Sequence, residues 1–111
     1  MTVSDILTKL PATCVTGSEM LDRQVDGIFC CDLLSLVMGR AKANDAWLTV
    51  MGNINAVAVA VLADVACIIV CEGMDVDESA IAKAKSQDVI ILKTELPIFE
   101  ASIAVDSAKS R

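Results

Sequence analysis

The sequence predicts a three-layer α/β/α fold with a mostly parallel sheet. From residue 25 onward, apolar runs of strand length alternate with helical segments, the order that produces parallel strands joined by crossover helices. The run from Ala66 to Cys71 is continuously apolar, which is typical of a central strand covered on both faces. Hydrophobic residues make up 55% of the chain and aromatic residues only 3%, so the core is expected to consist mainly of aliphatic side chains.

The amino-terminal half is expected to hold two helices and three strands. Thr2 or Ser4 can cap a short first helix, which Pro11 ends. Asp32 is placed to cap the second helix. The apolar residues of that helix recur at helical spacing and should face the sheet: Leu33, Leu34, Val37 and Met38. Strands are predicted at 13–16, 25–31 and 46–51.

The segment from Ala56 to Leu62 alternates Ala and Val, so its periodicity alone is also compatible with a strand. Gly52, Asn53 and Asn55 precede it and supply a turn and a cap, and about a dozen residues remain before the next strand, the length of a crossover helix. A helix is therefore predicted. Because this helix would be apolar on all sides, we expect it to be buried on two of them.

The last third is expected to add two helices around a further buried strand. Asp75 or Asp77 begins the first of these helices, and Glu78 stands three residues after Asp75 as in a capping box. A strand is predicted at 89–92, and a final helix begins near Pro97. At 111 residues, the whole chain, 1–111, is expected to form a single domain.

Composition and charge exclude several classes of function. The net charge is −6, which argues against a nucleic-acid partner because proteins that follow phosphate backbones gather basic side chains. The chain has no His, the residue most used for proton transfer and for binding transition metals. We therefore expect no catalytic residues, no cofactor and no metal. The high hydrophobic fraction suggests that a second copy covers part of the surface in a homodimer.

The cysteines and the longest apolar segment indicate where in the cell the protein is expected. The five cysteines are an odd number, and four of them, Cys30, Cys31, Cys67 and Cys71, lie inside apolar runs like small core residues. No secretory signal is evident, so a reducing cytoplasm is expected. The segment 54–70 is nearly all apolar but carries Asp64 near its middle, and it divides into a helix and a strand. We therefore expect no membrane span.

Several stretches together resemble the DRTGG domain family, and they cover nearly the whole chain. The likeness lies in their order and spacing: Asp22 to Gly27, Cys31 to Met38, Ala46 to Thr49, Asn55 to Leu62, Ile68 to Gly73 and Thr94 to Glu100. The resemblance implies an α/β/α domain similar to the amino-terminal domain of HPr kinase/phosphorylase. It also implies similarity to the DRTGG domains of phosphotransacetylases and CBS-containing pyrophosphatases, which are regulatory or dimer-forming parts without catalysis. The chain contains no phosphate-loop signature of a kinase.

The residues that give this family its name fall on two loops, and this sequence differs in both. Where relatives carry Gly-Asp-Arg, this chain has Gly52, Asn53 and Ile54, followed by Asn55; where they carry Thr-Gly-Gly, it has Cys71, Glu72 and Gly73. In a parallel sheet both loops lie at the carboxyl ends of strands, where open α/β sheets bind ligands. These seven residues form the candidate ligand-binding site. Loss of a cation and gain of Glu72 predict weaker binding of an anion than in relatives.

Each candidate feature also has a purely structural interpretation. Gly52 and Asn53 can be an ordinary turn and helix cap, and Gly73 can simply end a strand. The acidic cluster at 75–78 resembles half a calcium loop, but helix capping explains it better. Trp47 is either a stacking platform for a ring or, as we prefer, part of the core or an interface.

The sequence therefore favours a non-catalytic, dimeric regulatory module that senses a small molecule, such as a nucleotide, or a partner protein of a metabolic or redox enzyme. The alternative is a structural adaptor that binds another protein without a small-molecule ligand. An enzyme is disfavoured, because no phosphate loop, His or metal cluster is present to supply its chemistry.

Overall fold

Five strands form one mixed sheet, and five helices surround it. The computed structural model describes residues 1–109. Strand order across the sheet is β1-β5-β4-β3-β2; β2 to β5 run parallel to one another, and β1 pairs antiparallel with β5. In chain order the elements are α1 (Val3–Lys9), β1 (Thr13–Thr16), β2 (Gly27–Cys30), α2 (Leu34–Arg40), β3 (Asp45–Thr49), α3 (Ile54–Ala63), β4 (Cys67–Val70), α4 (Glu78–Ser86), β5 (Ile91–Lys93) and α5 (Ile98–Ser107).

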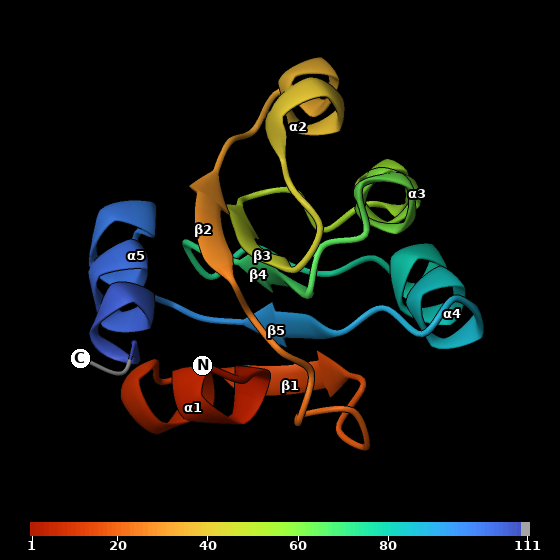
Figure 1. The fold of residues 1–111 in the computed structure, drawn as a ribbon. Helices are drawn as coiled ribbons and strands as arrows, with labels where there is room; N and C mark the ends of the chain where they lie inside the picture. The colour runs from red at the N-terminus through yellow and green to blue at the C-terminus, as the bar shows by residue number, and fades with distance from the viewer. Residues whose placement is uncertain (110–111) are drawn as a thin grey trace.

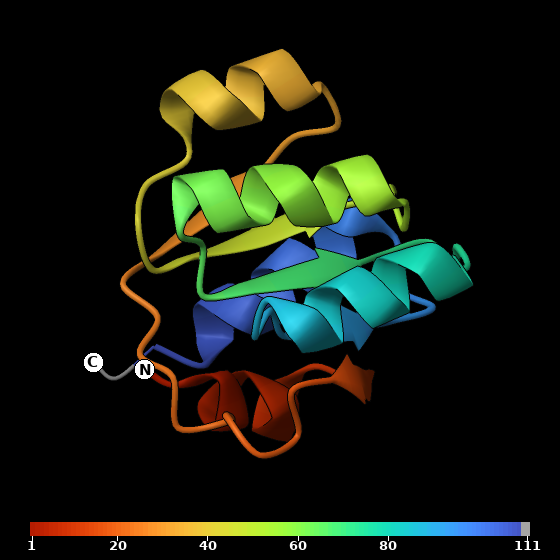
Figure 2. The same cartoon turned by 90° about the vertical axis from the view of Figure 1, so that its right-hand side faces the viewer.

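The helices form a layer on each face of the sheet. In Figure 1, α1 and α5 lie on one side of the strands and α3 and α4 on the other, with α2 beyond β2 at the end of the sheet. Figure 2 shows α2, α3 and α4 stacked one below another, with α3 and α4 in front of the strands. Each of the three helices links two neighbouring parallel strands. The predicted three-layer α/β/α fold with a mostly parallel sheet is confirmed.

Two apolar layers stabilise this arrangement, one on each side of the sheet. Alternate residues of each strand point to opposite faces, so Leu48 and Ile69 enter the layer under α1 and α5, while Trp47 and Ile68 enter the layer under α3 and α4. All four residues of β4 are buried, as the continuous apolar run predicts. Trp47 is fully buried and its Nε1–H donates to Cys31 O at 2.9 Å. This placement makes Trp47 a core residue.

The helix ends agree with the sequence at some positions and differ at others. Thr2 and Asp5 cap α1 reciprocally, and Asn53 caps α3. The predicted role of Asp32 was wrong: Leu33 is the N-cap of α2, and no side-chain hydrogen bond caps that helix. The capping box of Asp75 was also wrong, because Asp77 stands at the N-cap of α4 without a side-chain cap and Asp75 pairs with Lys93 instead, at 3.2 Å.

The apolar helix α3 is less covered than its composition suggests. It lies between α2 and α4 and against the sheet, but Leu62 is 72% exposed on its outer side. The apolar residues of α2 likewise do not all face inward, since Val37 is buried whereas Leu33 and Met38 are exposed. Segment 54–70 divides into α3 and β4, and among residues 1–109 no helix has the length and hydropathy to cross a membrane.

Candidate functional site

The two predicted loops lie side by side at the carboxyl edge of the sheet. They follow β3 and β4, which are adjacent and parallel. Backbone bonds tie each loop to the neighbouring segment: Cys71 N–H donates to Thr49 O, at the end of β3, at 2.8 Å, and Asp77 N–H, at the start of α4, donates to Gly52 O at 2.8 Å. A Cβ at Gly52 would overlap the Asp75 carbonyl, so this position requires glycine for close packing. The two loops therefore lie at the same edge, as the sequence predicts, and Asp75 and Asp77 pack against Gly52 of the first loop.

Asn53, Ile54 and Asn55 form the start of α3. Asn53 Oδ1 accepts a hydrogen bond from Ala56 N–H at 2.9 Å, which satisfies one of the free donors at the helix start. Ile54 and Asn55 are exposed. This geometry gives Asn53 a capping role and leaves the side chains of Ile54 and Asn55 accessible to a ligand.

Cys71 is a core residue. Its side chain is fully buried, and its Sγ donates to Ile69 O at 3.5 Å. Burial raises the pKa of the Cys71 thiol to about 12, with the nearby Cys30 and Glu72 adding to the effect. Cys71 is therefore a neutral thiol near pH 7, and it contributes packing to the site.

Glu72 and Gly73 form a tight turn after β4, on the way to α4, and it is hydrogen-bonded to the segment before α5. Both have left-handed backbone conformations, with φ of 63° and 65°. Their N–H groups donate to Leu96 O at 2.9 Å and to Thr94 O at 3.0 Å. The Glu72 carboxylate accepts a hydrogen bond from Ile98 N–H at 3.1 Å, at the positive end of the α5 dipole. Glu72 is thus a helix cap supplied from another loop, and this bond offsets the cost of a left-handed non-glycine residue.

Asp32 belongs to this edge, although its position in the sequence suggests a helix cap. Its Oδ1 accepts from Thr49 Oγ1 at 2.7 Å and from Val50 N–H at 2.9 Å. The carboxylate therefore holds the end of β3 from the loop that follows β2. No local pattern around Asp32 specifies this partner, because the two segments meet only through the parallel pairing of β2 and β3.

The carboxyl edge is strongly acidic. Exposed carboxylates surround the two loops, and Lys93 pairs with one of them, Asp75. The carboxylates are Asp32, Glu72, Asp75, Asp77, Glu78 and Glu95. A polyanion approaching this edge meets like charge, which agrees with the weaker anion binding expected from the sequence.

A hollow of about 610 Å³ adjoins this edge beside β1 and β5, and the sequence offered no signal for it. It is lined by 11–13 and 93–95. Glu95 connects it to the predicted site, because a Cβ at Gly73 would overlap the Glu95 carboxylate. None of the seven predicted residues lines this hollow or either of the two beside β2 described below.

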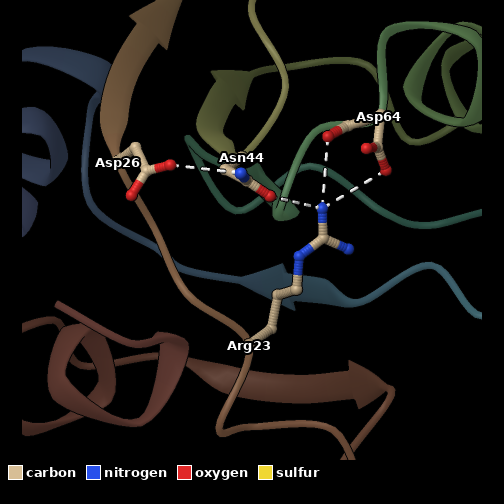
Figure 3. Close-up of polar contacts among 4 residues, drawn as sticks. All are labelled: Arg23, Asp26, Asn44 and Asp64. Carbon is tan, nitrogen blue, oxygen red and sulfur yellow. Dashed lines mark hydrogen bonds and ion pairs between the residues drawn. The ribbon is translucent and has the colours of Figure 1, made fainter.

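A polar network lies at the opposite, amino edge of the sheet (Figure 3). Arg23 Nη2 donates to Asn44 Oδ1 at 2.9 Å and to Asp64 O at 3.2 Å, and it lies 3.3 Å from Asp64 Oδ1. Asn44 Nδ2 donates to Asp26 Oδ2 at 3.1 Å. The network joins the segment before β2 to the loops before β3 and β4, so its function is structural.

Two kinds of group that are common in catalytic sites are missing from residues 1–109. The sequence has no His to act as a base. Within residues 1–109, no three Cys, Asp or Glu side chains are grouped so as to hold a metal ion. What the edge offers is exposed amide, carboxylate and backbone groups, which are suited to binding.

Comparison with known proteins identifies the fold and the family. The structure of the CBS and DRTGG domains of the regulatory region of Clostridium perfringens pyrophosphatase, complexed with its activator diadenosine tetraphosphate, superposes with a TM-score of 0.75. The two share 17% sequence identity; the match covers 99% of this chain and 50% of that one. The present chain thus spans about half the length of its structural match. Among curated proteins, no sequence matches it.

The sequence profile of the DRTGG domain matches residues 5–108, nearly the whole chain. This match agrees with the structural likeness to a region that contains a DRTGG domain. The chain is one small domain of the type found in that regulatory region, and no catalytic domain accompanies it within these residues. The chain belongs to the DRTGG domain family.

Proposed function

We propose that this chain is a non-catalytic regulatory module that dimerises and senses a small molecule or a partner protein of a metabolic or redox enzyme. The observation that carries this proposal is the correspondence of 99% of the chain to part of an enzyme's regulatory region. That region binds a dinucleotide activator. By analogy, the effector proposed for this chain is a small molecule of the nucleotide class, and the proposed site of action is the cytoplasm.

The carboxyl edge of the sheet is the proposed place of binding. Its two loops follow adjacent parallel strands, Ile54 and Asn55 expose their side chains there, and ligands of open α/β sheets bind at this edge. Because Glu72 and its acidic neighbours repel anions, the ligand is expected to carry less negative charge than a polyphosphate, or to bind through its base and sugar.

A thermal-shift screen tests this proposal. The purified chain is heated with nucleosides, nucleotides and phosphorylated metabolites, one at a time. A ligand present at about 100 times its dissociation constant should stabilise the fold by roughly 2.7 kcal/mol. Asn55→Asp should weaken this stabilisation, because it adds charge at an exposed position and leaves the Asn53 cap intact. The matched control, Gln87→Glu at the end of α4, should respond like the wild type.

An adaptor that binds another protein without a small-molecule ligand is the second candidate. The packing of Gly52 on Asp75 and the burial of Cys71 favour it, because the chain itself fills the space between the loops. Absence of a thermal shift with every compound would reject the sensor in favour of the adaptor. The adaptor hypothesis predicts saturable binding to a purified enzyme that is encoded by a gene next to the gene of this chain. If none of the enzymes encoded by neighbouring genes binds, the adaptor hypothesis is rejected.

A further inference from the structure

The sheet ends at β2, whose outer edge pairs with no strand among residues 1–109. Cys30 pairs with Leu48, and Cys31 N–H donates to Leu48 O at 3.2 Å. The backbone groups of Phe29 and Cys31 therefore face β3. Because backbone groups of alternate residues point to opposite sides of a strand, those of Ile28 and Cys30 point away from β3. The strand therefore presents unpaired donors and acceptors along its free edge.

This edge, although short, lacks the charges, prolines and bulges that often prevent strands from associating. Its four residues, Gly27–Cys30, include no charge and no proline. The opposite edge of the sheet provides an internal comparison. There, β1 has a register shift between Cys14 and Thr16, an irregularity of the kind that hinders pairing with a further strand. Of the two edges, β2 is the one suited to pairing.

Exposed apolar side chains of α5 lie beside β2. Phe99 is 69% and Ile103 52% exposed, and α5 packs against β2. A hollow of about 390 Å³ separates them, lined by Ile28, Ser102, Ile103, Asp106 and Lys109. Phe99 lies one helical turn before Ile103 and on the same stripe, so it extends this apolar surface toward the carboxyl edge.

The other side of β2 has a similar apolar border, formed by α2. Arg40 and Lys42 line a second hollow, of about 350 Å³, together with 26–29, 43 and 45. Leu33 and Leu36 stand seven and four residues before Arg40, which places all three on one side of α2. Both leucines are exposed. The free edge of β2 thus lies between two strips of exposed apolar side chains.

Charge along this surface changes sign from one end of β2 to the other. Arg40 and Lys42 lie near the amino end of the strand. Asp32 follows its carboxyl end, and Glu100 is in the first turn of α5 at the same edge. Two other groups at the amino end are already bonded within the chain: Lys109 pairs with Asp106, and Asp26 accepts from Asn44. An antiparallel copy of β2 would place the acidic end of one surface opposite the basic end of the other.

We propose that β2 pairs antiparallel with β2 of a second copy of this chain, so that two sheets become one across a two-fold axis, with the apolar strips of α5 and α2 packed around the joint. Such an isologous interface needs a self-complementary surface, and the change of charge along β2 supplies it. A standard interface buries about 800 Å² per partner, roughly one-seventh of the 5600 Å² surface of this chain. This inference rests on the dimer in the proposed function.

Sedimentation and hydrogen exchange of surface variants test this interface. Phe99→Asp and Ile103→Asp place a carboxylate in the joint, and each should raise the dimer dissociation constant by roughly 30-fold or more. Both side chains are exposed in the single chain, so the variants should keep the wild-type circular dichroism and melting of the monomer. Leu62→Asp is the matched control, because Leu62 is equally exposed on the outer side of α3 and should leave the dissociation constant unchanged. In the wild type, the amides of Ile28 and Cys30 should become protected as the concentration is raised through the dimer dissociation constant.

The outcomes separate this interface from the dimer itself. Loss of dimer in the two α5 variants, with protection of Ile28 and Cys30 in the wild type, supports the interface. A stable wild-type dimer that both variants retain, with these two amides unprotected, would place the contact elsewhere and overturn the inference while leaving the dimer intact. A wild-type chain that remains monomeric at millimolar concentration would overturn both.

Discussion

At the scale of single residues, cysteine shows how burial changes chemistry. All five cysteines are free thiols. Cys67 lies inside β4 with no exposed surface, and burial raises the pKa of its thiol to about 12, although Arg23 acts in the opposite direction. A thiol with this pKa is neither a nucleophile nor a metal ligand near pH 7. Cys67 therefore acts as a small apolar core residue, as its apolar sequence context indicates.

The raised pKa of Cys67 predicts a loss of stability in alkaline solution. The ordinary thiol pKa is 9.0 and the folded value about 12, so the unfolded chain releases this proton first. The contribution to stability is complete below pH 9 and is lost as the pH rises from about 9 toward 12, by about 1 kcal/mol per pH unit. Urea unfolding over this range should show a shallower pH slope in Cys67→Ala than in the wild type. Equal slopes would contradict the prediction.

Two acidic residues at the carboxyl edge hold other parts of the structure in place. Asp32 and Glu72 both hold segments that are distant in the sequence, through Thr49 and Val50 in one case and the start of α5 in the other. Their carboxylates are therefore structural groups as well as sources of negative charge. Any ligand of this edge has to bind beside them, since displacing either would break hydrogen bonds that position β3 or α5.

At the scale of elements, two glycines illustrate how context decides the effect of the same substitution. Gly52 packs against the Asp75 carbonyl, whereas nothing lies within 4 Å of the place where a Cβ would stand on Gly39 in α2. Gly52→Ala should lower the free energy of unfolding by about 2 kcal/mol through overlap. Gly39→Ala should raise it by about 0.5 to 1 kcal/mol, because alanine loses less backbone entropy in a helix.

Urea denaturation of the two variants beside the wild type measures both effects. The opposite signs provide the control, since a general intolerance of alanine would lower stability in both. A Gly52→Ala chain as stable as the wild type would mean that the two loops at the carboxyl edge can separate without cost. Such a result would also make room for a ligand between them.

At the scale of the whole molecule, the burial pattern predicts where the structure opens last. β4 lies at the centre of the sheet with all its residues buried, whereas β1 lies at one edge with a register shift. Amides at the centre of such a sheet exchange only when the whole domain unfolds, and those at an edge also exchange through local opening. Hydrogen exchange should therefore be at least about tenfold slower in β4 than in β1. Equal rates would show that the sheet opens as one unit.

Local patterns allowed the fold to be predicted, because each helix and strand depends mainly on nearby residues. The continuous apolar run predicted β4, and Asn53 predicted the start of α3. The helix ends at Asp32 and Asp75 were predicted wrongly, because a carboxylate that can cap a helix can equally bond a neighbouring strand or a lysine. Only the packed structure decides between such partners.

The position of the candidate site could be predicted from the sequence, whereas the structural roles of its residues could not. Parallel strands bring the loops after β3 and β4 together, so Gly52 and Gly73 were expected at one edge. The burial of Cys71 and the use of Glu72 as the cap of α5 depend on how the chain returns through β5, which no spacing near these residues encodes.

The sequence by itself determined the order of the elements and the mostly parallel sheet, because these follow from periodicity, turn residues and composition along the chain. The family followed from the resemblance of several segments to the DRTGG domain. The tertiary structure alone decided which apolar side chains stay exposed. Phe99, Ile103 and Leu33 have the same character in the sequence as buried neighbours such as Val105 and Val37. Their exposure depends on the places where the helix layers stop covering the sheet, and this boundary leaves the outer edge of β2 unpaired among residues 1–109.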